Sequence, residues 1–309
     1  MKNYNEASKI KKKSFAQAFV LWLKKDGPAW LMIAPFLIIG IMFIFEPLIM
    51  GIRTSFFETR GFECVEFIGL DNYKNVISDS VFVKAMMNTI KYALWSIVLG
   101  LFVPVIVAVA LNEIIHGKGF FRFATYFPCI LPGVVTAVMW VIMFDPGDGG
   151  VLNYVRSLMG LPAVQWLNDP GMTIQLIVVT MTWGGFGSTA ILYLADLQSV
   201  NTDLYEAISL DGGGVLTKLR HITIPHMSGM IKMLFIMQII NVFQIFYQPL
   251  TMTGGGPNNA SISLTQVAYN YAFKTMEMGK STATSVLTAL MIMIFSIFYM
   301  KIKSKNMNE

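Results

Sequence analysis

Charged side chains are scarce in this sequence. Of its 309 residues, 13% are Asp, Glu, Lys or Arg, 55% are hydrophobic, and the mean hydropathy is +0.59. A soluble domain usually carries about 25% charged residues. This shortage argues against a large soluble protein and favours a chain that is embedded in a membrane.

The sequence is also poor in the residues that build metal centres and nucleophilic active sites. Its two cysteines, Cys64 and Cys129, are too few and too far apart for a disulfide framework or a metal site. The three histidines, His116, His221 and His226, lie in or beside the loops between apolar runs. We therefore expect no enzyme activity in this chain, and no resident metal or cofactor.

Long apolar runs dominate the rest of the chain. Crossing a bilayer takes about 20 apolar residues in a helix. Six stretches meet this requirement: residues 30–50, 93–115, 121–144, 174–194, 231–252 and 283–300. Several contain proline or glycine, which bundled membrane helices tolerate because neighbours satisfy the freed backbone groups. The sequence therefore predicts an all-α membrane protein with six transmembrane helices.

The distribution of positive charge predicts the orientation, because loops rich in Lys and Arg are normally cytoplasmic. The termini and the loops around Lys118 and Lys218 hold 15 of the 23 Lys and Arg residues. The pI of about 9.1 thus reflects membrane orientation, and we expect no nucleic-acid partner. We expect a cytoplasmic segment over 1–29, a transmembrane domain over 30–304 and a cytoplasmic tail over 305–309, in the cell membrane.

One polar segment, residues 204–227, lies between the fourth and fifth spans. Asp203 and Glu206 have the spacing of a helix start, in which an N-cap and a carboxylate satisfy free N–H groups. The helix is expected to run to Asp211 and to stop at Gly212, since glycine allows a left-handed turn. The segment is expected to face the cytoplasm.

A second short helix, residues 216–222, is expected to follow and to end at Pro225. The first helix would expose Leu204, Tyr205 and Ile208 beside carboxylates. Two interpretations are open: an ordinary amphipathic connector, or a docking element whose apolar residues fit a groove on a partner.

The same residues resemble the EAA loop of ABC importer permeases. That pattern is E-A-A, three residues, G, nine residues, I, one residue, L-P, and the matching positions are Glu206, Ala207, Gly212, Ile222, Ile224 and Pro225. Ile208 replaces the second alanine, Ile224 replaces the leucine, and Gly213 stands where alanine is usual. In that family the first helix docks in a cleft on a cytoplasmic ATPase subunit.

We name residues 198–227 the coupling loop. The resemblance implies that it contacts the ATPase through Tyr205, Glu206, Ala207, Ile208, Asp211, Gly212, Ile222 and Pro225.

Three further stretches extend the resemblance over most of the chain. "FIGLDNYKNV" (67–76) is similar to an extracellular segment of carbohydrate permeases, and "WLNDPG" (166–171) fits the loop before the fourth span. "MTGGGPNN" (252–259), followed by "YAFKTMEMGKSTATS" (271–285), is similar to the loop before their last helix. Together these stretches resemble the MalF/UgpA-like permeases of sugar importers.

This resemblance implies a set of partners. They are a second homologous permease subunit, two cytoplasmic ABC ATPase subunits, an extracytoplasmic solute-binding protein, a carbohydrate and membrane lipid. ATP hydrolysis is then expected on a partner chain, and transport is expected to proceed by alternating access.

"MGKST" (278–282) contains the end of a phosphate-binding P-loop pattern. That pattern needs a glycine five residues before Gly279, and the residue there is Lys274. The stretch also follows no predicted strand. We therefore expect no nucleotide site in this chain.

Polar residues in the fifth span indicate a path for a solute. Gln238, Asn241, Gln244 and Gln248 fall within a stripe about 120° wide on a continuous helix. Hydrogen bonds between helices would also explain amides in a membrane. The alternative is a polar lane for sugar hydroxyls, with Trp183 of the fourth span offering an aromatic face.

The interiors of the last three spans lack Lys, Arg, Asp and Glu, which favours an uncharged, polyhydroxylated solute. A polyol or glycerol phosphate is an alternative solute. An ATPase-independent channel or secondary carrier is an alternative mechanism, although neither an internal repeat nor coupling charges are found. Gly184, Gly185 and Gly187 are expected to serve close helix packing. Glu46, the one carboxylate within a span, is given no role.

Overall fold

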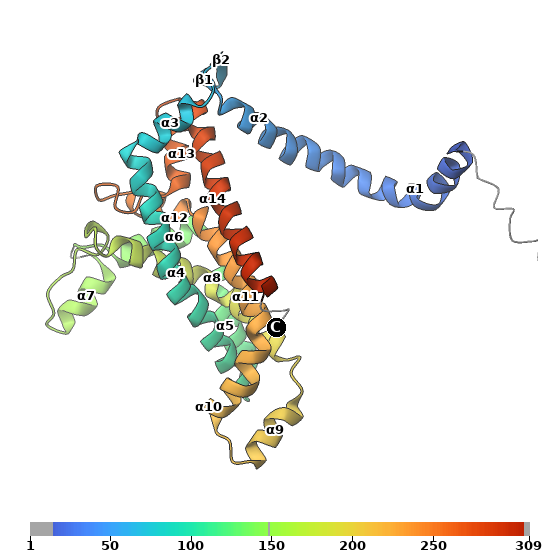
Figure 1. Ribbon diagram of the computed structural model, residues 1–309. Coiled ribbons are helices and arrows are strands. Elements are labelled where there is room, and N and C mark those ends of the chain that lie inside the picture. The colour runs from blue at the N-terminus through green and yellow to red at the C-terminus, as the bar shows by residue number, and fades with distance from the viewer. Residues whose placement is uncertain (1–14, 148, 306–309) are drawn as a thin grey trace, which may run out of the picture. The chain divides into compact units, whose positions relative to one another are not determined.

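The structure, a computed structural model, describes residues 15–147 and 149–305 (Figure 1). The chain divides into two compact units, Met1–Arg53 and Thr54–Glu309, which we describe separately. Helices make up most of the described residues in both units.

The described part of the first unit, residues 15–53, is a run of helix. It consists of α1 (Phe15–Gly40), a π-helical turn (Ile41–Phe45) and the beginning of α2 (Glu46–Thr54). The segment Asp26–Thr54 is long and apolar enough to cross a membrane, and none of its most apolar window is buried within the structure. This segment contains the first predicted span, and Glu46 stands at the first position of α2.

Four long helices form the frame of the second unit: α4 (Ser80–Glu113), α8 (Thr173–Leu197), α11 (Ile224–Phe243) and α14 (Met278–Lys305). Each belongs to a segment that is long and apolar enough to span a membrane. They correspond to the second, fourth, fifth and sixth predicted spans.

The helix α4 starts well before residue 93, where the second span was expected to begin. The carboxylate of Asp79 caps it by accepting a hydrogen bond from the N–H of Val81 at 2.8 Å. Polar residues of its first turns, including Asn88 and Tyr92, are buried and bond to loop carbonyls. Because these polar groups find partners inside the protein, the helix continues beyond its apolar stretch.

The third predicted span, 121–144, is not one helix. It consists of α5 (Lys118–Ile130) and α6 (Gly133–Met143), which meet at an angle of 96°. Pro132 has no N–H to donate to the carbonyl of Pro128, and a residue before proline avoids the helical region. Leu131 accordingly has an extended backbone with ψ of 133°. The structure thus has six candidate spans among its described residues only if this bent pair counts as one.

The fifth predicted span, 231–252, also ends earlier than expected. The helix α11 stops at Phe243, and a separate helix, α12 (Tyr247–Thr253), follows a short break. Pro249 cannot donate to the carbonyl of Ile245. That buried carbonyl instead accepts a hydrogen bond of 2.7 Å from the hydroxyl of Ser263.

At its other end, the fifth span begins earlier than expected. After α10 (Val215–Lys218), a π-helical turn, η3 (Leu219–Thr223), leads directly into α11. The expected helix end at Pro225 is therefore wrong. Proline at this position lies in the first turn of α11, where its missing N–H is tolerated. The result is one helical segment, Val215–Phe243, that joins the coupling loop to the membrane bundle.

Shorter elements connect these helices. An antiparallel hairpin of β1 (Phe57–Arg60) and β2 (Glu63–Phe67) pairs Phe57 with Phe67 and Arg60 with Glu63. It is a small exception to the all-α prediction. The other short elements are α3 (Asp71–Ser78), α7 (Val151–Leu158), the 3-10 turn η2 (Trp166–Asn168), α9 (Thr202–Leu210) and α13 (Leu264–Phe273).

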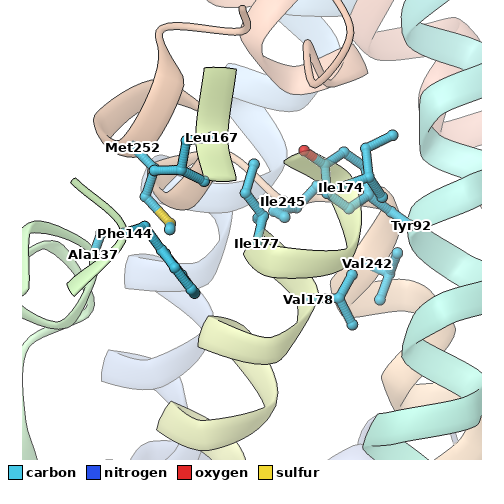
Figure 2. Packing of buried hydrophobic residues seen from close by; sticks show 10 residues of the cluster. All are labelled: Tyr92, Ala137, Phe144, Leu167, Ile174, Ile177, Val178, Val242, Ile245 and Met252. Carbon is cyan, nitrogen blue, oxygen red and sulfur yellow. The ribbon is translucent and has the colours of Figure 1, made fainter. Parts of the chain in front are cut away.

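The packing of the second unit is anchored by buried apolar clusters. Figure 2 shows the cluster in which side chains of α4, α6, η2, α8, α11 and α12 and of the adjoining loops meet: Tyr92, Ala137, Phe144, Leu167, Ile174, Ile177, Val178, Val242, Ile245 and Met252. A second cluster joins α4, α8 and α11 around Tyr193 and Met227. Between the residues that join these two clusters, α8 carries the polar residues Ser188 and Thr189, and α11 carries Gln238 and Asn241.

One glycine of α8 has a clear packing role. A Cβ atom at Gly187 would lie 2.0 Å from the carbonyl oxygen of Thr125 on α5. Glycine is therefore required for this close approach, as predicted for helix packing. Gly184 has only an ordinary contact with Thr136, and Gly185 has none, so the prediction holds chiefly for Gly187.

Candidate functional site

The coupling loop begins with a capped helix. The side chain of Asn201 accepts a hydrogen bond of 3.0 Å from the N–H of Asp203, so Asn201 is the N-cap of α9. The prediction that Asp203 is the N-cap is wrong. Asp203 lies in the first turn, where a carboxylate still interacts favourably with the helix dipole.

The end of α9 follows the predicted glycine turn. Gly212 has φ of 77°, a left-handed conformation. Its N–H donates to the carbonyl of Ser209, and the N–H of Gly213 donates to that of Ile208 at 2.8 Å. These two bonds form a Schellman motif, which ends the helix and satisfies its last carbonyls.

Tyr205 is directed toward the protein and not outward as predicted. Its hydroxyl shares a hydrogen bond of 3.1 Å with the hydroxyl of Thr223, which is buried in η3. His226, at the start of α11, shares a further bond of 3.1 Å with Ser199 at the end of α8. The first and last parts of the coupling loop are thus bonded to each other.

The exposed apolar residues of the coupling loop differ from those predicted. Leu204 is 52% exposed, as expected, but Ile208 is only partly exposed. Leu210 is 89% exposed, and Val215 and Leu216 are 70% and 78% exposed. These three residues flank the glycine turn, where no exposed apolar residues were predicted.

The remaining predicted coupling residues lie on or near α9, in η3 and at the start of α11. Glu206, Ala207 and Asp211 are exposed on or just after α9. Ile222 is partly buried in η3, and Pro225 is exposed at the start of α11. The predicted coupling residues therefore fall into an exposed group on α9 and a group that connects the loop to the bundle.

A polar pocket lies among α4, α8 and α11, in the membrane-spanning part of the second unit. Two cavities of about 200 and 240 Å³ share five lining residues: Gly100, Ser188, Thr189, Gln238 and Asn241. A Cβ atom at Gly100 would lie 2.4 Å from Nε2 of Gln238. Glycine on α4 therefore makes room for the amide of Gln238.

The predicted amide stripe is only partly realised. Gln238 and Asn241 line both cavities, and Gln248 lines one of them. Gln244 is exposed, caps the end of α11 and lines neither cavity. The expected continuous stripe is wrong because α11 breaks after Phe243.

Trp183 does not line either cavity. Its ring contacts Trp140 edge to face, with centroids 5.8 Å apart. The aromatic residues at the cavities are Phe186, Tyr193 and Phe235.

The pocket can form hydrogen bonds but carries no charge. Its two cavities are lined by hydroxyls, amides, glycines and apolar side chains, without any Asp, Glu, Lys, Arg or His. Amides and hydroxyls both donate and accept hydrogen bonds. The pocket is therefore suited to a neutral solute with many hydroxyl groups.

Comparison with known proteins identifies the family. Residues 100–305 match the family described as the binding-protein-dependent transport system inner membrane component. This range contains both the coupling loop and the polar pocket. The chain belongs to this family.

Individual relatives of the permease agree with this assignment. It is 31% identical over 279 residues to the multiple sugar-binding transport system permease protein MsmF of Streptococcus mutans, with 89% of this chain and 95% of the relative covered. It is 30% identical over 274 residues to the trehalose/maltose transport system permease protein MalF of Thermococcus litoralis, with 88% and 92% covered.

The fold of the permease is also found in a solved structure. That structure is of a bacterial alginate ABC transporter in complex with an alginate pentasaccharide-bound periplasmic protein. The TM-score is 0.79 and the identity 22%, over 90% of this chain and 95% of that chain. The chain therefore shares the fold of that transporter chain. Its long apolar helices agree with the predicted multi-pass membrane protein.

The loop "MTGGGPNN" of the permease is held against α4. Asn88 donates hydrogen bonds to the carbonyls of Asn259, at 2.8 Å, and of Ile262, at 3.1 Å. The hydroxyl of Tyr92 donates to the carbonyl of Ser261 at 2.8 Å. These polar residues of α4 thus fix the loop that precedes the last span.

The helix α13, which precedes the last span, is bonded to the start of α4. The hydroxyl of Tyr271 donates to Asp79, the N-cap of α4. Burial and the hydrogen bond to this carboxylate raise the pKa of Tyr271 above its usual value.

The stretch "MGKST" has a packing role in the permease. The N–H of Gly279 donates to the hydroxyl of Thr59 at 2.9 Å, and a Cβ atom there would lie 2.4 Å from the carbonyl oxygen of Phe57. Lys280 forms an ion pair with Glu277. Its glycine and lysine are thus used in contacts with the hairpin and the neighbouring turn.

Proposed function

We propose that this permease is one transmembrane subunit of an ATP-driven importer that moves a neutral sugar or oligosaccharide into the cytoplasm. The uncharged pocket lined by Gln238, Asn241, Ser188 and Thr189 carries this proposal. The sugar transport systems named for its relatives support it. The absence of a lining cation disfavours an anionic solute such as glycerol phosphate.

The proposed assembly contains four kinds of subunit. This chain pairs with a second homologous permease, because its helices line only part of a path. Two cytoplasmic ATPase subunits hydrolyse ATP, and an extracytoplasmic solute-binding protein delivers the sugar. The alginate transporter, which was solved in complex with a periplasmic protein, supports the last partner. Both termini and the coupling loop are proposed to lie in the cytoplasm, where loops rich in Lys and Arg normally lie.

The ATPase is proposed to contact the exposed side of α9 and the glycine turn. Leu204, Leu210, Val215 and Leu216 offer apolar contacts there, and Glu206 offers a charge. Exposed apolar side chains next to charges are typical of a surface that docks in a groove.

Movement of the coupling loop would reach the pocket through one element. The segment Val215–Phe243 is helical throughout, and it carries Gln238 and Asn241 near its far end. The bond between Tyr205 and Thr223 joins α9 to the same segment. A displacement of α9 by the ATPase would therefore shift the side chains that line the pocket. This is a physical route for alternating access, since packed helices move as rigid elements between discrete states.

Transport by the assembled complex tests the proposal. The permease is reconstituted with its second permease, ATPase subunits and binding protein, and uptake is measured for neutral oligosaccharides, polyols and glycerol phosphate. We expect ATP-dependent uptake of a neutral sugar, with stimulation of ATP hydrolysis by the loaded binding protein. Uptake of glycerol phosphate alone would overturn the substrate class. Uptake that needs no ATPase subunit would overturn the mechanism.

A further inference from the structure

A second, basic pocket lies at the end of the bundle that carries the coupling loop. It has a volume of about 250 Å³ and is formed where the ends of α4 and α8 meet the beginnings of α5 and α9. Figure 1 shows α5, α9 and α10 at this end of the second unit. The polar and charged residues that line it are Asn112, Lys118, Arg122, Gln198, Thr202 and Tyr205.

The charge of this pocket has one sign. Lys118 and Arg122 are one turn apart on α5, and no Asp or Glu lines the pocket. Among the residues that the structure describes, neither cation forms an ion pair. The Nε atom of Arg122 is buried and has no hydrogen-bond partner. Because a buried N–H group without a partner is costly, this arrangement indicates a site for an anion.

The uncharged lining suits an anion with several oxygens. Asn112 and Gln198 supply amide N–H donors, and Thr202 and Tyr205 supply hydroxyls. The first turn of α5 adds backbone N–H groups, since its N-cap is Gly117 and has no capping side chain. Phosphate oxygens accept hydrogen bonds from such donors. They also pair with arginine through two parallel N–H···O bonds.

The surroundings of the pocket indicate that the phosphate belongs to a lipid. The same helix, α5, exposes Phe120, Phe123 and Phe127, which are 70%, 60% and 46% exposed. Exposed phenylalanines beside cations suit the boundary between headgroups and acyl chains. Basic pockets between transmembrane helices on the cytoplasmic side are known to bind acidic headgroups.

We propose that this pocket binds the phosphate group of an anionic phospholipid, with acyl chains against the phenylalanines of α5. Lys118 and Arg122 neutralise the phosphate, and Arg122 directs its free Nε–H to an oxygen. Tyr205 lines the pocket and also bonds to Thr223. A bound headgroup therefore contacts the residue that joins α9 to the transmembrane segment. The influence of lipid on transport rests on the proposed function, whereas the binding site itself does not.

Lipid retention tests the site. The assembled complex is purified from membranes that contain phosphatidylcholine and phosphatidylglycerol, and bound lipid is counted by native mass spectrometry. The variants are Lys118→Gln and Arg122→Gln, with Lys232→Gln as the matched control, because Lys232 is exposed on α11 and lines none of the pockets described above. We expect each pocket variant to weaken phosphatidylglycerol retention about fivefold, which corresponds to about 1 kcal/mol per cation. The control is expected to retain lipid like the wild type.

The second arm distinguishes the source of the phosphate. Inorganic phosphate is titrated into complex reconstituted in phosphatidylcholine alone, and binding is followed by 31P NMR. Weak binding of inorganic phosphate, together with strong retention of phosphatidylglycerol, supports the lipid. Phosphate binding that Arg122→Gln abolishes, without lipid retention by the wild type, overturns the lipid and assigns the pocket to a soluble phosphate.

Two other outcomes would overturn the proposal. Equal lipid retention by Arg122→Gln, Lys118→Gln and the wild type would show that the pocket binds no headgroup. If these variants instead weakened co-purification of the ATPase subunits, the pocket would be assigned to an acidic side chain of that partner. Both readouts are independent of sugar uptake, so the site can fail while the proposed function stands.

Discussion

The side chain of Ile208 occupies the space that a β-carbon at Gly213 would need. A Cβ atom built at Gly213 lies 2.4 Å from Cγ2 of Ile208, and 2.9 Å from its carbonyl oxygen. These are the two positions at which this permease has a different residue from the alanine usual in the EAA pattern. The larger residue at 208 is therefore matched by the smaller one at 213, and the two differences form one compensated change.

We expect Gly213→Ala to disturb the coupling loop. The added methyl group would force the stiff β-branched side chain of Ile208 out of place, and such overpacking typically costs about 1–3 kcal/mol. ATPase stimulation by the loaded binding protein should fall in the assembled complex. The double variant Ile208→Ala/Gly213→Ala should recover the part of this loss that the Ile208 side chain causes, with a coupling energy of about 1 kcal/mol in the double-mutant cycle. Additive effects of the two substitutions would contradict the compensation.

Gly212 is expected to tolerate asparagine better than alanine. Its left-handed backbone costs an ordinary L-residue about 1–2 kcal/mol, whereas asparagine visits this region readily. Gly212→Ala should therefore reduce both ATP hydrolysis and sugar uptake by the reconstituted complex, and Gly212→Asn should retain most of both. If the two variants were equally impaired, the requirement would be for the absence of a side chain and not for the backbone conformation.

The sequence was most informative about the coupling loop, because its signals are local. The glycine turn after Asp211 depends on residues within one turn of helix, and it was predicted correctly. The same local pattern misplaced the N-cap, since Asn201 and Asp203 are both good caps. The direction of Tyr205 depends on Thr223, which lies on another element, so it could not be predicted.

The breaks in the third and fifth spans lay beyond what hydropathy can predict. Both predicted spans contain proline, but membrane helices often continue through proline when neighbours satisfy the freed carbonyl. The chain breaks near Pro249 because Ser263, from a distant segment, holds the carbonyl of Ile245. Likewise, the long start of α4 depends on loop carbonyls that only the folded structure brings to Asn88 and Tyr92.

Tyr205→Phe tests the connection between α9 and the transmembrane segment. The substitution removes one hydrogen bond to Thr223 and leaves the ring in place, a change typically worth about 0.5–1.5 kcal/mol. We expect the complex to assemble normally, whereas the uptake of sugar per ATP hydrolysed should decrease. Thr223→Val should give a similar loss, and the double variant should be no worse than either single one. Unchanged coupling in both single variants would assign the bond to local stability alone.

Substitutions of Asn241 and Gln244 distinguish a solute site at the pocket from one along a continuous stripe of amides. Asn241 and Gln244 lie one helical turn apart and are both exposed, but Asn241 lines both cavities and Gln244 lines neither. We expect Asn241→Ala to lower sugar uptake several-fold by removing a hydrogen bond to a hydroxyl, while complex assembly and ATP hydrolysis without sugar persist. Gln244→Ala, a matched loss of an amide, should transport like the wild type. Equal loss of uptake in both would favour the continuous stripe that the sequence predicted. Loss of assembly in Asn241→Ala would instead mean that its amide joins helices, because a residue that only contacts the sugar leaves the empty complex intact.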